Sequence, residues 1–172
     1  MLADFCSIGF SGHRALNITE CKTIFKLARL SIQSWCEVLT GCAKGADAAA
    51  RAGANGKAKV FRVTNFNKSA FALRSISFIN ALAESNAPVL CVWPGCKCPN
   101  KLYPSKKSQK CFNGFGSGSW STAALNVGLG LPVIIFGLQK SALPYWGVWS
   151  QAPKQLSSGF MLTRTTKQLT LF

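Results

Sequence analysis

Short apolar segments alternate with helix-forming segments five times along this chain, and this alternation limits the possible folds more than any other feature. The predicted strands are residues 5–10, 36–40, 59–63, 88–93 and 132–136. The fourth is apolar throughout, as a strand buried on both faces of a parallel sheet should be. Alternating strands and helices pack as a parallel sheet with helices on both faces and right-handed crossovers.

The helical segments carry end signals and apolar faces. Asn17 and Glu20 have the spacing of a capping box, and a helix is predicted after them. Its apolar face is predicted to hold Ile24, Phe25, Ala28, Ile32 and Trp35. A second long helix is predicted over residues 70–84. We therefore predict an α/β fold, a Rossmann-like three-layer sandwich with a mainly parallel sheet of about five strands plus a C-terminal edge segment.

At 172 residues the chain is expected to form one domain, residues 1–172. Two segments fall outside the alternation. Residues 94–115 form an insertion with five lysines, three cysteines and three prolines, and residues 138–172 form a C-terminal extension. Within the extension, residues 159–172 could add an edge strand or a hairpin. Trp146 and Trp149 suit either base stacking or burial against the sheet.

The net charge of +15 is distributed unevenly. Residues 1–84 hold eleven Lys and Arg and all five acids, whereas residues 85–172 hold nine Lys and Arg and no acid. This imbalance favours a polyanionic partner, such as a nucleic acid or a phosphate-bearing small molecule, over a cationic or neutral one. A basic surface that serves only solubility is the alternative.

No secretion signal or membrane-spanning run is visible, so we expect a cytoplasmic protein with reduced thiols and no membrane partner. Cys6, Cys36 and Cys91 fall in predicted strands and are expected in the core. A zinc site would need a fourth ligand beside the three insertion cysteines. We therefore predict no metal and no cofactor, with zinc as the alternative for Cys96, Cys98 and Cys111.

The stretch LTGCAKGADAAARAGA, residues 39–54, joins a strand end to an alanine helix through a glycine loop. Gly41 and Gly45 permit a tight turn, and such a loop points backbone N–H groups at a ligand above the helix start. Lys44 adds a positive charge to this anion site. An ordinary turn with a solvated lysine is the alternative.

Three loops follow predicted strands: residues 11–14, 41–47 and 116–119. The carboxyl ends of parallel strands form the ligand crevice of an open α/β sheet. With these loops the chain resembles the SLOG superfamily, which includes the DNA-processing protein DprA and the LOG (Lonely Guy) nucleotide hydrolases. GCAKGADAAARAGA is similar to the DprA-type GLARGIDAAAH stretch, and GSGSWSTAALNVGLGLPVIIF to its SGSLxTA helix and following strand. The segment from Leu73 to Leu82 is similar to the arginine-bearing helix of that family.

The resemblance implies a phosphate-binding crevice for nucleotides or single-stranded nucleic acid. It assigns the site to Ser11, Gly12, His13, Arg14, Gly41, Lys44, Gly45, Asp47, Arg74, Gly116, Ser117, Gly118, Ser119 and Thr122. The lysines of the insertion would extend that site as a nucleic-acid surface; they are Lys97, Lys101, Lys106, Lys107 and Lys110. A loop clear of any ligand is the alternative for the insertion.

LOG enzymes carry a catalytic glutamate where this chain has Thr122, and a threonine cannot act as a carboxylate base. The sequence therefore favours a non-catalytic binding protein, with no catalytic residue assigned. The alternatives are a LOG-like phosphoribohydrolase or other nucleotide-processing enzyme, and a small-nucleotide sensor. As in many relatives, a homodimer is conceivable.

Several of these residues have purely structural alternatives. Arg14 also suits a surface salt bridge, and Asp47 a favourable place in the first turn of a helix. Ser119 and Thr122 are both suited to helix N-capping. His13 has no paired carboxylate nearby in sequence, which argues against a base, and Arg74 is as well suited to solvent as to the crevice.

Overall fold

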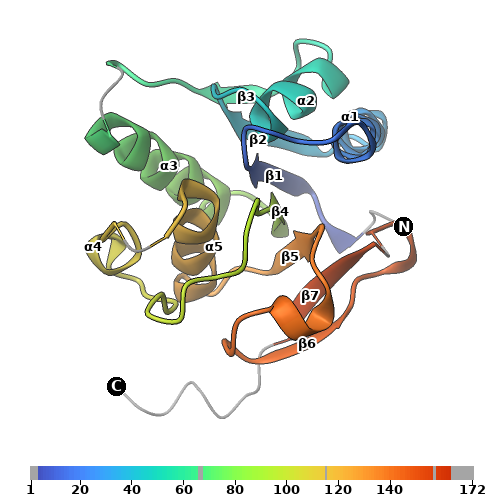
Figure 1. The fold of residues 1–172 in the computed structure, drawn as a ribbon. Coiled ribbons are helices and arrows are strands. Elements are labelled where there is room, and N and C mark those ends of the chain that lie inside the picture. Colours follow the sequence, from blue (N-terminus) through green and yellow to red (C-terminus); the bar gives the residue numbers. More distant parts are fainter. Residues whose placement is uncertain (1–3, 66–67, 115, 157, 164–172) are drawn as a thin grey trace.

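The computed structural model describes residues 4–65, 68–114, 116–156 and 158–163, and its elements form one seven-stranded sheet (Figure 1). The strand order is β3-β2-β1-β4-β5-β7-β6. The five strands from β3 to β5 are parallel, and their order is the one found in Rossmann folds. The predicted α/β class is confirmed, and the sheet has more strands than predicted.

The element bounds differ from the predicted bounds mainly at the ends. The strands are β1 (Ser7–Gly12), β2 (Glu37–Gly41), β3 (Lys59–Phe61), β4 (Pro88–Trp93), β5 (Val133–Phe136), β6 (Val148–Gln151) and β7 (Gly159–Thr163). The helices are α1 (Ile18–Gln33), α2 (Ala46–Gly53), α3 (Lys68–Ala83), α4 (Ser108–Cys111) and α5 (Gly118–Gly128), with short 3-10 turns at Lys140–Ala142 and Lys154–Leu156. The first strand is thus shifted two residues toward the loop that follows it.

The helices form a layer on each face of the sheet (Figure 1). Helices α1 and α2 cover one face, where Ile8, Phe10 and Val38 pack against Ile24 and Ala28. Helices α3 and α5 cover the other face, with a core that includes Phe78, Leu82, Leu90, Trp120 and Leu125. Burial of both sheet faces explains why β4 needs apolar residues at every position.

The crossover direction reverses between β1 and β4, which lie side by side. β1 pairs with β4 so that Gly12 stands beside Trp93, and it pairs with β2 on its other side. From β1 the chain builds outward to β2 and β3, then returns to add β4 and β5. The loops after β1 and β4 therefore diverge at a topological switch point, where α/β sheets bind ligands.

The C-terminal extension does not add its last strand at the edge. β7 inserts antiparallel between β5 and β6, and β6 forms the edge of the sheet. Residues 159–163 thus contribute a hairpin with an earlier strand, and the rest of the predicted segment, residues 164–172, lies outside the described residues. Trp146 and Trp149 are both buried, which confirms the burial alternative.

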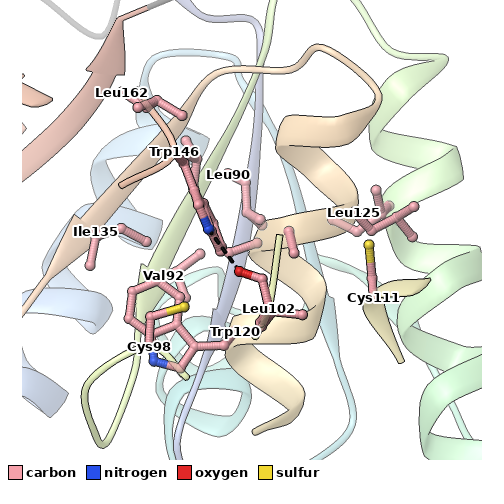
Figure 2. Packing of buried hydrophobic residues seen from close by; sticks show 14 of the residues in the cluster. Leu90, Val92, Cys98, Leu102, Cys111, Trp120, Leu125, Ile135, Trp146 and Leu162 are labelled. Carbon is pink, nitrogen blue, oxygen red and sulfur yellow. Dashed lines mark hydrogen bonds between the residues drawn. The ribbon is translucent and has the colours of Figure 1, made fainter. Parts of the chain in front are cut away.

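The insertion packs into the core. Cys98, Leu102 and Cys111 are buried in the cluster beneath α5, and Trp146 donates its Nε1 hydrogen to the Leu102 carbonyl at 3.0 Å (Figure 2). The indole of Trp120 stands edge-on to that of Trp146, with ring centroids 5.7 Å apart. Three buried side chains and an indole hydrogen bond fix a segment that its lysines and prolines alone would leave without structure.

Three predicted core positions are wrong. Asn17 and Glu20 do form the capping box, but Phe25 is exposed and Trp35 lies beyond the end of α1 with its side chain 96% exposed. The buried residues of α1 are instead Ile24, Leu27, Ala28 and Ser31. Cys6 is also exposed, whereas Cys36 and Cys91 are buried as predicted. Among the described residues, no helix is long and apolar enough to cross a membrane.

Candidate functional site

Backbone hydrogen bonds join the loops that follow β1, β2 and β4. The His13 amide donates to the Trp93 carbonyl at 2.9 Å, and the Ala46 amide donates to the His13 carbonyl at 3.3 Å. The loop after β1 is therefore tied to the end of β4 on one side and to the start of α2 on the other. The structure thus brings Ser11 to Arg14 and Gly41 to Asp47 together, as the predicted crevice requires.

Residues 41–45, here called the lysine loop, are held by charged side chains from two helices. Asp47 on α2 accepts a hydrogen bond from the Ala43 amide at 3.1 Å. Arg51, one turn later, donates to the carbonyls of Gly41 at 2.7 Å and Ala43 at 3.2 Å. Carbonyls and amides that would otherwise need water are satisfied by side chains. The loop is therefore held in one shape without a ligand.

Arg74 crosses from α3 to complete this arrangement. Its Nη1 donates to Oδ2 of Asp47 at 2.8 Å, and the two side chains are only 11% and 5% exposed. A Cβ at Gly41 would overlap Arg74 Nη1, so only glycine lets the guanidinium pass. Arg74 is therefore neither solvated nor available as a primary phosphate ligand. It positions the loop through Asp47, which in turn accepts the hydrogen bond from the Ala43 amide.

Lys44 projects from the braced loop. Its side chain is exposed, and no hydrogen bond or ion pair is found for it among the described residues. Gly45, which follows it, has φ +72° and ψ −124°, a conformation that side chains other than hydrogen rarely permit. This turn lies between Lys44 and helix α2, which carries the Asp47 and Arg51 side chains that hold the loop. An exposed amine on a fixed loop is suited to an anionic group.

Arg14 lies on the neighbouring loop with its guanidinium carbon 5.1 Å from the centre of the Phe71 ring. Phe71 is on α3, one turn before Arg74, and its contact orients an exposed arginine that would otherwise be mobile. The predicted salt-bridge alternative for Arg14 finds no carboxylate among the described residues. The N–H donors of the Arg14 guanidinium remain available to an anionic ligand, because the contact with the Phe71 ring face does not use them.

Residues 116–119, here called the serine loop, lie at the start of α5. Ser117 is the N-cap and accepts from the Trp120 amide at 3.4 Å, and its hydroxyl lies 2.9 Å from that of Ser119. Trp120 donates its Nε1 hydrogen to the Cys96 carbonyl at 2.8 Å, which ties this helix start to the loop after β4. The N-cap is thus Ser117, rather than either of the two predicted candidates.

The predicted phosphate-binding role of Thr122 is wrong. The residue is 1% exposed, and its hydroxyl donates to the Gly118 carbonyl within the helix at 2.6 Å. Neither its surface nor its proton is free for a ligand, so we remove it from the candidate phosphate-binding residues.

His13 has a carboxylate partner that its immediate sequence does not reveal. Its Nε2 lies 3.5 Å from Oε2 of Glu20, and both side chains are mostly buried. The same glutamate oxygen accepts from the Asn17 amide in the capping box. The helix cap therefore fixes the carboxylate that orients the imidazole. A histidine held in this way at a crevice can exchange protons with a ligand.

Sequence reasoning missed three residues of this region: Glu20, Arg51 and Phe71. Glu20 was assigned to the cap alone, although helix caps can serve a second residue. Arg51 follows Asp47 by four residues, a spacing that places both on one side of a helix. Phe71 precedes Arg74 by three residues, which likewise gives the two side chains a common face. These spacings were readable, but the partner atoms across the loop were not.

The lysines of the insertion, Lys97, Lys101, Lys106, Lys107 and Lys110, are all exposed. Burial raises the pKa of Cys98 to about 12, with a smaller contribution from Cys96, and burial also raises the pKa of Cys111. Among the described residues, no group of three or more His, Cys, Asp or Glu side chains is placed to hold a metal ion.

Two hollows in the described surface do not lie over the crevice. One of about 570 Å³ is bounded by Arg14, Gly45 and residues of α1 and α2, and one of about 410 Å³ lies further along the same two helices. Only Arg14 and Gly45 belong to both the first hollow and the predicted site. We therefore assign the crevice on its anion-binding groups.

Comparisons with models of protein families, with curated proteins and with solved structures found no match for this chain. The class that the fold defines is a Rossmann-like α/β protein with a switch-point crevice. The more specific resemblance to SLOG proteins stays a prediction that rests on the quoted motifs.

Proposed function

We propose that this protein binds nucleotides or single-stranded nucleic acid through their phosphates at the carboxyl edge of the sheet, without catalysis. The lysine loop carries the proposal. Its backbone is fixed by Asp47, Arg51 and Arg74, while Lys44 is left unpaired among the described residues. Because the backbone of the loop is ordered before a ligand arrives, only the Lys44 side chain has to lose freedom when it binds a phosphate.

Arg14 supports the same reading from the adjacent loop. The two cations flank the backbone junction at His13 and Ala46, and Gly12 stands beside Trp93 at the switch point. A lysine and an arginine on neighbouring loops can share one phosphate or take two successive phosphates of a strand. The carboxylates nearest the loops are already engaged, Asp47 by Arg74 and Glu20 by the cap and His13, which leaves the exposed charge positive.

The test is calorimetry with a nucleoside monophosphate and with an oligothymidylate. Lys44→Ala and Arg14→Ala should each weaken binding by about 1.5–3 kcal/mol, the range for hydrogen bonds to charged groups. Lys57→Ala removes an exposed lysine before β3, at the opposite edge of the sheet, and should have little effect on the monophosphate. Wild-type affinity in the Lys44→Ala/Arg14→Ala double variant would contradict the crevice.

The insertion distinguishes a polymer from a mononucleotide. Changing its five lysines to serine should flatten the log–log salt slope of oligothymidylate binding by up to about 3.5, at about 0.7 per phosphate contact. Monophosphate binding should barely change, because Lys44 and Arg14 remain. An unchanged slope would instead favour a small-nucleotide sensor, in which the insertion has no ligand role.

The His13–Glu20 pair favours a second candidate, a nucleotide-processing enzyme. A carboxylate that orients an imidazole is the usual support for a general base, and here it replaces the glutamate that α5 lacks. Chromatography of nucleoside monophosphates incubated with the protein checks this candidate. Release of base or phosphate that is lost in His13→Ala and reduced in Glu20→Gln would establish it. Absence of turnover would leave the binding protein.

A further inference from the structure

Helices α1 and α2 lie side by side (Figure 1), and the two hollows described above lie along them. Phe25 borders both of these hollows, and we treat the two together as one groove. We call it the α1–α2 groove, and its apolar lining is Leu16, Cys21, Phe25, Ile32, Ala49 and Ala52. It follows the length of α1, whose sixteen residues span roughly 24 Å.

The groove exists because α2 has almost no side chains. Ala46, Ala50 and Gly53 face the core, where a Cβ on Gly53 would overlap the Phe25 carbonyl, so the two helices touch backbone to backbone. On the outer side, Ala48, Ala49 and Ala52 supply only methyl groups. A solvent-facing helix surface ordinarily carries charged or long polar residues, which would fill such a space.

The charges around the groove have one sign. Lys22 and Arg29 on α1 and Lys57 after α2 line it, and no carboxylate does. None of the three cations forms an ion pair within the described part of the chain. Arg14 also borders the groove, but its guanidinium is turned over Phe71. The complement of this surface is an apolar ridge flanked by carboxylates.

We propose that the α1–α2 groove docks an acidic amphipathic helix of another protein. Apolar side chains at positions i, i+4 and i+7 of the partner lie along the alanines of α2 and Phe25, with Glu or Asp beside Lys22 and Arg29. A second copy of this chain is a poor occupant, because its net charge is +15. A bilayer is also a poor occupant, because a flat surface does not enter a concave groove between helices. The proposal does not depend on the function of the crevice.

Fluorescence anisotropy with a labelled peptide tests the proposal. The probe is a helical peptide of about sixteen residues with leucines at that spacing and glutamates on both flanks. Its controls are a scrambled peptide of equal composition and a version with lysine for glutamate. We expect binding of the patterned acidic peptide alone. Ala52→Leu, which fills the groove floor, and Lys22→Glu/Arg29→Glu, which reverses the rim, should each weaken it about tenfold or more.

Two matched variants leave the groove intact. Ala83→Leu makes the same change at an exposed position of α3, and Lys26→Glu reverses one charge at a position of α1 that does not line the groove. Both should bind the peptide within about threefold of wild type. Circular dichroism melting confirms that each variant is folded.

Three results would overturn the proposal. The first is no difference between the patterned and scrambled peptides. The second is wild-type peptide binding by Ala52→Leu. The third is a groove variant that loses oligothymidylate or anionic vesicles of phosphatidylserine while the peptide shows no specific binding, which would assign the surface to a nucleic acid or a membrane.

Discussion

The lysine loop and the serine loop meet the same edge of the sheet, but they are held by different means. The lysine loop is braced by Asp47, Arg51 and Arg74, so charged groups from α2 and α3 fix its backbone. The serine loop is held by the N-cap of its own helix and by one indole hydrogen bond. Side chains that reach across from other elements make a loop rigid before any ligand binds. A local cap fixes only the start of its helix.

The difference matters for function because, of these two loops, only the lysine loop carries a cation, and it does so on a backbone that is already held. Its brace is buried, so the interactions that shape the loop and the charge that faces solvent are separate. The serine loop offers the exposed Ser117 hydroxyl and helix amides but no charge, and its Ser119 is buried. We therefore expect the lysine loop to supply most of the affinity for a phosphate, and the serine loop to orient the bound phosphate through hydrogen bonds.

The largest expected effect comes from breaking the brace. Arg74→Ala leaves the Asp47 carboxylate buried without its partner, which should lower the free energy of unfolding by about 3–5 kcal/mol in urea titrations. Lys59→Ala is the control, because the Lys59–Glu37 pair is 4.0 Å apart with side chains 55% and 44% exposed, and it should cost less than about 1 kcal/mol. Equal losses in the two variants would show that the brace contributes no more than a surface pair.

The second prediction compares the change in stability when one glycine of each loop is replaced by alanine. Gly45→Ala places a side chain at φ +72° against the His13 carbonyl and should destabilise the protein by about 2 kcal/mol or more. At Gly118 an added Cβ meets nothing within 4 Å, so Gly118→Ala should be neutral or stabilising by up to about 1 kcal/mol. Thermal melting of both variants measures the contrast, and a neutral Gly45→Ala would refute it.

A smaller effect tests the cap of the serine loop. The Ser117 hydroxyl accepts from the Trp120 amide at 3.4 Å, whereas Asn17 accepts from the Glu20 amide at 2.9 Å in a complete capping box. Ser117→Ala should therefore cost about 0.5 kcal/mol of unfolding free energy and Asn17→Ala about 1 kcal/mol. The reverse order would mean that the serine loop depends on its cap more than this geometry indicates.

The smallest effect concerns salt. A double-mutant cycle of Arg74→Ala and Asp47→Ala gives the coupling of the brace, and raising NaCl from low to high concentration should change it by less than about 0.5 kcal/mol, because buried pairs are weakly screened. Monophosphate binding through exposed Lys44 should weaken over the same range. A coupling that falls together with the binding would indicate a brace open to solvent.

The fold was largely readable because parallel α/β sheets impose strong local patterns. β4 was bounded correctly at Pro88–Trp93, and the capping box at Asn17 and Glu20 placed the start of α1. The first strand was predicted to begin at Phe5, whose apolar side chain suits a strand, but its pairing with β2 and β4 begins only at Ser7. The order of the last two strands was not readable, since nothing local requires β7 to pair with β5 before β6.

The candidate site was readable only in part. The glycines and Lys44 were identified because a strand–loop–helix turn needs particular residue types. The partners of Asp47 and His13 were not, because Arg74 is 27 residues away in sequence and Glu20 was already explained by its cap. Thr122 was misassigned because the start of α5 did not show which hydroxyls face the core.

The sequence by itself determined the alternation of strands and helices, the position of the glycine loops and the excess of positive charge. These follow from periodicity, backbone freedom and composition, which are properties of neighbouring residues. The tertiary structure alone decided that Arg74 braces the lysine loop, that Trp146 buries the insertion, and that an alanine helix leaves a groove beside α1. Those outcomes depend on which surfaces meet across the fold, and contacts between residues far apart along the chain leave no local pattern.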